Sequence, residues 1–230
     1  MWNRKELKTN AKGALKRNYW KAVVASIVLG IVAGVFSSNA SNASDAVQEA
    51  QVEQIFSSMG PEVLLVAIGM ILAACLVSGI ISILISAFVT NPLGVGAQKL
   101  LINCKDDSAQ MDNLLFGFKN SYLNVVKIMF LKGLFTSLWS LLLIVPGIVK
   151  AYEYRMIPYL LADNPDMDRK EAFARSKEMM MGNKWNAFVL DLSFIGWHLL
   201  GGITLGIVEI FYVLPYNYLT DAELYHALKK

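Results

Sequence analysis

Residues Val63–Val89 read VLLVAIGMILAACLVSGIISILISAFV and contain no charged side chain. A helix that crosses a bilayer needs about 20 predominantly apolar residues, so this stretch is long enough to span with some tilt. An amphipathic helix in a soluble protein would carry a polar stripe along one face, and this stretch carries none. The sequence therefore predicts a transmembrane helix here.

The composition agrees with insertion into a membrane. Hydrophobic residues make up 55% of the chain and charged residues 17%, whereas soluble domains usually carry about 25% charge. Neither Lys nor Arg occurs between Lys21 and Lys99, and this interval also holds a second apolar block, Ala22–Phe36. We therefore expect an all-α integral membrane protein, a helical bundle with amphipathic interfacial helices.

The first residues concentrate positive charge, although the net charge is only +3. A basic run beside a hydrophobic span usually holds that end of the helix in the cytoplasm, and we favour this interpretation over nucleic-acid binding. A cleaved signal peptide ending near Ser38–Ala40 is the alternative. Asn3 and Glu6 form a helix-capping pattern, so we expect residues 1–20 to be a retained, cytoplasmic amphipathic helix at the inner membrane surface. The basic residues are Arg4, Lys5, Lys8, Lys12, Lys16, Arg17 and Lys21.

Hydropathy and the positions of basic residues together predict a membrane domain, residues 21–230, with about six spans. An extracellular segment, 37–62, and cytoplasmic segments 91–121 and 162–184 connect them, and both termini are cytoplasmic. The predicted spans are residues 21–36, 63–90, 122–145, 147–161, 185–200 and 203–218.

The fourth span has the weakest hydropathy, because Lys150, Glu153 and Arg155 interrupt it. Each charge at the centre of a bilayer costs about 2.5–3.5 kcal/mol on insertion scales. If this segment did not cross, however, the basic residues of 163–185 would face outward, against the positive-inside rule. The requirement that residues 163–185 lie on the cytoplasmic side therefore favours a fourth span that crosses the membrane.

Three sequence features predict breaks between helices. Asn91–Gly96 contains Pro and Gly and should break or bend the second span near the inner surface. Pro146-Gly147 should form the tight turn between the third and fourth spans, and Gly201-Gly202 should join the last two.

Small residues recur at intervals of four in the first two spans, a pattern typical of close helix packing in membranes. Packing within one molecule is the ordinary interpretation, and homodimerisation is the alternative. The residues are Ala22, Ser26, Gly30 and Gly34 in the first span, and Ala74, Ser78, Ser82 and Ser86 in the second.

Ionisable residues inside the predicted spans are candidates for function, because hydrocarbon penalises them. Counting residues along the predicted helices places Arg155 and Glu209 at similar depths in the membrane, so these two side chains could pair. Lys150 and Glu153 are three residues apart on one helix and could pair within it. These groups either form a proton- or ion-conducting pathway or neutralise one another and hold the bundle together, and both alternatives satisfy the cost of burial. The candidate cluster comprises Lys150, Glu153, Arg155, Asp191, His198 and Glu209.

Enzyme motifs are missing from the sequence. There is neither a phosphate-binding loop of the Gly-x-x-x-x-Gly-Lys-Ser/Thr type nor a His-Glu-x-x-His pair. An intramembrane serine protease would need an activated Ser facing a His, and Ser78 with His198 is the one candidate pair. Cys75 and Cys104 lie in different predicted environments. We therefore predict no catalytic residue, no cofactor, no metal site and no disulfide.

An ordered set of motifs in the C-terminal part resembles the bacterial membrane-protein family catalogued as domain of unknown function 975. Tyr19-Trp20 after the basic helix and Asn91-Pro92-Leu93 also fit this resemblance. It implies a multi-span protein of the bacterial cytoplasmic membrane and implies no reaction. The motifs are Leu143–Tyr152, Leu161–Pro165, Ala172–Met180, Gly182–Trp185, Leu192–Trp197, Thr204–Ile207 and Leu214–Tyr216.

The function predicted from the sequence is that of a non-enzymatic structural or accessory membrane component, acting with a partner membrane protein or in envelope homeostasis. The alternatives are a small transporter or channel that uses the charges of spans four to six, and an intramembrane or lipid-modifying enzyme. The expected partners are the lipid bilayer and another membrane protein or a second copy of the chain, and no nucleic acid.

Overall fold

The computed structural model describes residues 2–34 and 60–229, and these form helices and no strand. The all-helical prediction is therefore confirmed for this part of the chain. The predicted extracellular segment 37–62 and the candidate cleavage site lie largely outside it. The α-helices are α1 (Arg4–Arg17), α2 (Tyr19–Val32), α4 (Pro61–Ile85), α5 (Asn91–Asn103), α6 (Phe116–Lys119), α7 (Tyr122–Leu142), α8 (Ile144–Glu153), α9 (Ile157–Asp163), α10 (Arg169–Met180), α11 (Lys184–Leu192), α12 (Ile195–Ile203) and α13 (Leu214–Leu228). Shorter elements are the π-helices η1 (Ser86–Thr90) and η3 (Glu209–Val213) and the 3₁₀ helix η2 (Met111–Leu115).

Three helical segments are long and apolar enough to cross a membrane: Glu62–Asn103, Tyr122–Leu142 and Lys184–Ile203. They correspond to the second, third and fifth predicted spans, although the third ends at Leu142, three residues before its predicted end. The other three predicted spans correspond to α2, which has 14 residues, to α8 followed by α9, and to η3 followed by α13. Length and hydropathy therefore support three spans, and three more depend on shorter or interrupted helices.

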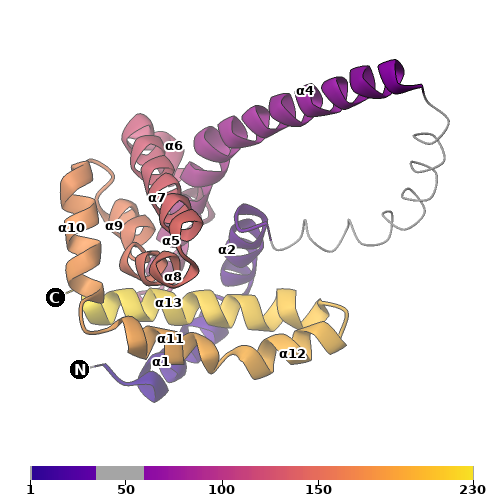
Figure 1. Ribbon diagram of the computed structural model, residues 1–230. Coiled ribbons are helices and arrows are strands. Elements are labelled where there is room, and N and C mark those ends of the chain that lie inside the picture. The colour runs from indigo at the N-terminus through magenta and orange to yellow at the C-terminus, as the bar shows by residue number, and fades with distance from the viewer. Residues whose placement is uncertain (1, 35–59, 230) are drawn as a thin grey trace.

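The helices form a packed body from which one long helix extends (Figure 1). Both termini and α10 lie at one end of the molecule, whereas the turn between α12 and η3 and the N-terminal end of α4 lie at the other. The core contains residues of α1, α2, α5, α9 and α13. Large apolar side chains remain exposed along α4 and the C-terminal half of α7, so the apolar surface is concentrated away from the termini.

Helix α1 begins as its capping pattern predicts, because the Asn3 side chain accepts a hydrogen bond of 3.0 Å from the backbone N–H of Lys5. Its apolar side chains, however, are buried in the protein core, where α1 packs against α13. That face therefore packs against the protein, since it includes fully buried Ala11; the position of this helix at the inner membrane surface stays a prediction.

The helix does not break at Asn91–Gly96; it continues from α4 through η1 into α5. Pro92 has no N–H to donate to the carbonyl of Phe88, four residues earlier. The π-helical turn η1 ends at Thr90, two residues before this proline, and the Tyr122 hydroxyl donates a hydrogen bond of 2.8 Å to the Phe88 carbonyl. A change of hydrogen-bonding pattern and a side chain from α7 thus accommodate the proline without ending the helix.

Both predicted glycine turns lie inside helices. The chain reverses at extended Leu143, and Pro146 occupies the first turn of α8, where its missing N–H costs nothing. A Cβ atom on Gly147 would lie 2.4 Å from Ser140 Oγ, so this glycine allows α7 and α8 to approach closely. Similarly, Gly201 lies within α12 against Glu209, and the reversal comes later, at Leu205 and Gly206, both with positive φ.

The two predicted packing stripes behave differently. Ala22, Ser26 and Gly30 are buried, whereas Gly34 lies beyond the end of α2 with φ +71°. In α4 and η1 the stripe Ala74, Ser78, Ser82 and Ser86 is exposed. The hydroxyls of Ser78 and Ser82 donate to carbonyls of their own helix, at 3.0 and 2.8 Å. This second stripe therefore makes no buried packing face in the part of the chain that the structure describes.

Candidate functional site

Arg155 is the centre of a charge network that joins three helices. Its guanidinium donates two hydrogen bonds to the Asp191 carboxylate, at 2.7 and 2.8 Å, and a third to Asp221, at 2.6 Å. The Tyr152 hydroxyl donates to Asp191 at 2.6 Å. A bidentate guanidinium–carboxylate pair is among the strongest polar contacts in proteins. The network ties the end of α8 to α11 and α13.

A break between α8 and α9 places Arg155 in this position. The helix ends at Glu153 and begins again at Ile157. Fully buried Ser176 of α10 bridges the gap, because its hydroxyl donates to the Glu153 carbonyl at 2.7 Å and accepts from the Met156 N–H at 3.3 Å. One side chain from another helix therefore satisfies backbone groups that the break would leave unpaired.

Glu153 lies between two lysines. Its Oε1 accepts a hydrogen bond of 2.9 Å from Lys150, as the spacing predicts, and its Oε2 accepts one of 2.7 Å from Lys184. The side chain of Glu153 is only 6% exposed. Both carboxylate oxygens of this buried acid thus contact a cation.

The expected Arg155–Glu209 pair is absent. Glu209 Oε1 instead lies 2.9 Å from His198 Nδ1, while Oε2 is buried with no hydrogen-bond partner among the described residues. The depth estimate behind that expectation assumed continuous helices, and the break after Glu153 moves Arg155 toward Asp191. Asp191 and His198, both members of the candidate cluster, take part in separate pairs.

Three residues of the network were not predicted from the sequence. Asp221 lies after the last predicted span, so it was read as part of a cytoplasmic tail. Lys184 lies just before a span, and the hydroxyl of Tyr152 carries no charge to mark it. One signal in the sequence could have indicated further partners. If Lys150 pairs with Glu153, the buried guanidinium of Arg155 has no carboxylate on its own helix and must find one elsewhere in the chain.

Neither cysteine forms a disulfide: Cys75 is exposed and Cys104 is buried. Burial raises the pKa of the Cys104 thiol to about 12, so the thiol stays protonated and unreactive at neutral pH.

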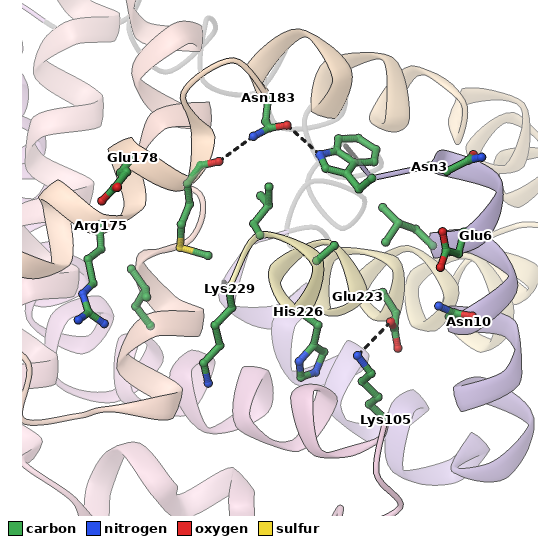
Figure 2. A pocket seen from close by; sticks show the side chains of 16 residues that line it. Asn3, Glu6, Asn10, Lys105, Arg175, Glu178, Asn183, Glu223, His226 and Lys229 are labelled. Atoms are coloured by element: carbon green, nitrogen blue, oxygen red, sulfur yellow. Dashed lines mark hydrogen bonds and ion pairs between the residues drawn. The ribbon is translucent and has the colours of Figure 1, made fainter.

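A cavity of about 820 Å³ lies at the end of the molecule that holds both termini (Figure 2). Its walls come from the start of α1, the end of α10 and the end of α13, with Lys105 from the segment after α5. The Trp2 indole N–H closes one side by donating a hydrogen bond of 2.9 Å to Asn183 Oδ1. No member of the predicted charge cluster lines this cavity.

A second cavity, of about 430 Å³, lies between the α4–η1 junction and α7, and its lining combines apolar side chains with the amide of Asn91 and three serine hydroxyls, of Ser82, Ser86 and Ser137. Neither Glu153, Arg155 nor Glu209 reaches it. The two cavities are therefore separate from the charge network that the sequence singled out.

Comparison with known proteins identifies a family for the C-terminal part. Residues 141–230 match the family described as "Protein of unknown function (DUF975)". This match confirms the resemblance carried by the motifs from Leu143 to Tyr216, all of which it contains. The features at Tyr19-Trp20 and Asn91–Leu93 lie outside the matched part. No curated protein and no solved structure matches the chain.

Proposed function

We propose that this chain, which matches the DUF975 family over residues 141–230, is an integral protein of the bacterial cytoplasmic membrane that acts as a non-enzymatic structural or accessory component. It crosses the bilayer six times, with both termini in the cytoplasm. The Arg155 network carries this proposal, because it pairs charged side chains from three parts of the chain with one another inside the protein.

The arrangement of the helices supports the topology. Three segments are long and apolar enough to span, and both termini lie at the same end of the molecule (Figure 1). Helix α10 lies at that end and the basic helix α1 begins there (Figure 1), and the positive-inside rule favours basic residues on the cytoplasmic side. The exposed apolar surface of α4 is available for lipid or for a partner membrane protein.

The pairing of the charges supports a structural role. Arg155 is shared by Asp191 and Asp221, Glu153 by Lys150 and Lys184. Buried ion pairs are costly to break from one side, by about 3–5 kcal/mol, and are often neutral to replace as a whole. A structural network therefore has a specific signature: single substitutions destabilise, and neutralising all partners restores stability.

Thermal unfolding of the purified chain in detergent tests this signature. We expect Arg155→Gln to lower the unfolding temperature strongly, and the triple variant Arg155→Gln, Asp191→Asn, Asp221→Asn to recover a large part of the loss. Arg175→Gln, which removes an exposed guanidinium of α10, is the matched control and should change little.

Liposomes that contain the wild type and the triple variant separate the two functional alternatives. If the triple variant folds but abolishes a proton or ion flux that the wild type shows, the chain is a transporter and the structural proposal is wrong. Reporter fusions after Asp163 and Gly206 test the topology separately: a cytoplasmic signal at the first and an extracellular signal at the second are expected.

A further inference from the structure

The cavity at the termini holds a buried carboxylate, that of Glu223, whose capacity to accept hydrogen bonds is only partly used. The side chain of Glu223 in α13 is 7% exposed, and its single ionic contact is 3.9 Å, to half-exposed Lys105. It forms no hydrogen bond with any described residue. A buried carboxylate normally accepts several hydrogen bonds, so Glu223 retains acceptor positions at the wall of an 820 Å³ cavity.

Three acidic and three basic side chains line this cavity, and two of the basic ones have partners outside it. Arg175 pairs outside the cavity with Glu171, and Lys229 shares Asp163 with Lys99. Figure 2 shows Glu6 and Glu178 at the walls opposite one another, and neither forms an ion pair within the described ranges. Glu6, Glu178 and Glu223 therefore face the cavity together with Lys105, the lining cation that has no partner outside it among the described residues.

The uncharged lining also favours a ligand that donates hydrogen bonds. His226 Nε2 lies 3.3 Å from the Ile102 carbonyl oxygen. A carbonyl oxygen accepts a hydrogen bond, so Nε2 carries the proton, and Nδ1 of the neutral ring is left as an acceptor. Burial lowers the pKa of His226 and keeps the ring neutral at pH 7. Trp2 adds an aromatic face, and such faces attract organic cations.

We propose that this cavity binds a small organic cation with N–H donors, an ammonium or guanidinium compound, through Glu223, Glu6 and Glu178 and against the Trp2 ring. Its volume lies in the range of about 300–1,000 Å³ that is typical of small-molecule sites. The site goes beyond the structural role proposed above and does not depend on the number of spans. Because Trp2 and α1 form one wall, the ligand contacts both ends of the chain.

Isothermal titration calorimetry of the full chain in dodecyl maltoside tests this site. Spermidine and agmatine are the cationic probes, tetramethylammonium is the cation without N–H donors, and inorganic phosphate is the anion. We expect saturable binding of spermidine or agmatine and none of phosphate. Glu223→Gln should weaken the binding at least tenfold, whereas Asp112→Asn, an exposed charge paired with Lys119, should change it less than twofold.

If Glu223→Gln does not fold, Glu6→Gln with Glu178→Gln, both exposed positions, replaces it, and we expect binding at least threefold weaker. Nanodiscs distinguish the source of the cation: competition by phosphatidylethanolamine against spermidine indicates a lipid headgroup, and its absence indicates a soluble amine. The proposal is wrong if neither amine binds, if phosphate binds instead, or if the cavity variants and Asp112→Asn weaken binding equally.

Discussion

Helices α4 and α5 are two parts of one continuous helical segment, Glu62–Asn103, and they have opposite environments. In α4 an 18-residue apolar window has no buried residue, and Leu65 and Leu76 are 71% and 69% exposed. In α5, by contrast, Val95, Ala97 and Leu100 are completely buried. High hydropathy therefore marks the part of this helix that faces away from the protein, and smaller, mixed side chains mark the part that enters the core.

Glycines explain how α5 packs so closely. A Cβ atom at Gly96 would lie 2.0 Å from the Leu114 carbonyl oxygen, and one at Gly117 would lie 2.3 Å from the carbonyl oxygen of Pro92. The backbones of α5 and of the η2–α6 segment thus approach at positions where only glycine fits. Gly69 and Gly79 of α4 have no atom within 4 Å of such a Cβ, so the same residue type has no packing role there.

Gly96→Ala should have the largest effect on stability. Its new methyl group would overlap a backbone oxygen that cannot move like a flexible side chain, and we expect a loss above about 5 kcal/mol, enough to unfold a marginally stable protein. The yield of monodisperse protein after gel filtration in detergent measures this loss. Gly79→Ala is the matched control, and a helix-propensity gain of at most about 1 kcal/mol is expected there. Equal yields from the two variants would contradict the difference between α4 and α5.

Leucine truncation should show the same difference with a smaller effect. Leu100→Ala in α5 removes a completely buried side chain and should cost about 2–5 kcal/mol, from lost burial and a residual cavity. Leu76→Ala in α4 removes a side chain that contacts little of the protein and should change the unfolding temperature in detergent only slightly. A large effect of Leu76→Ala would mean that α4 packs against a second copy of the chain under the conditions of the measurement, which gel filtration would show as a dimer.

The sequence predicted α4 well because an apolar, uncharged stretch needs no tertiary contact to be recognised. It predicted α5 poorly for the opposite reason. The contacts of Gly96 and Gly117 depend on a segment that returns after the helix ends, and no local pattern specifies that return. Likewise, the spacing of Lys150 and Glu153 on one helix predicted their ion pair, whereas the Asp221 partner of Arg155 lies 66 residues away.

Rules for helix breaks also failed for a physical reason. Proline and glycine mark sites where a helix can end, but neighbouring groups can supply what the helix lacks. Gly147 and Gly201 serve close contacts inside helices, with Ser140 and Glu209. Ser176 bridges the break between Glu153 and Ile157, where the sequence has no Pro-Gly pair to predict a break. The position of a turn in this protein is therefore decided by side chains of other helices.

Tyr122→Phe tests the junction between α4 and α5, with the smallest expected effect. The Tyr122 hydroxyl bonds to the Phe88 carbonyl, the group that Pro92 cannot pair. Its removal leaves one acceptor without a partner, and we expect a loss of about 1–3 kcal/mol in the free energy of unfolding. In the double variant Tyr122→Phe, Pro92→Ala, the backbone N–H of residue 92 can donate to that carbonyl. The hydroxyl should then matter less, so the two substitutions should not be additive. Additive losses in thermal unfolding would mean that the tyrosine stabilises α7 independently of the proline and that the π-helix alone joins the two parts.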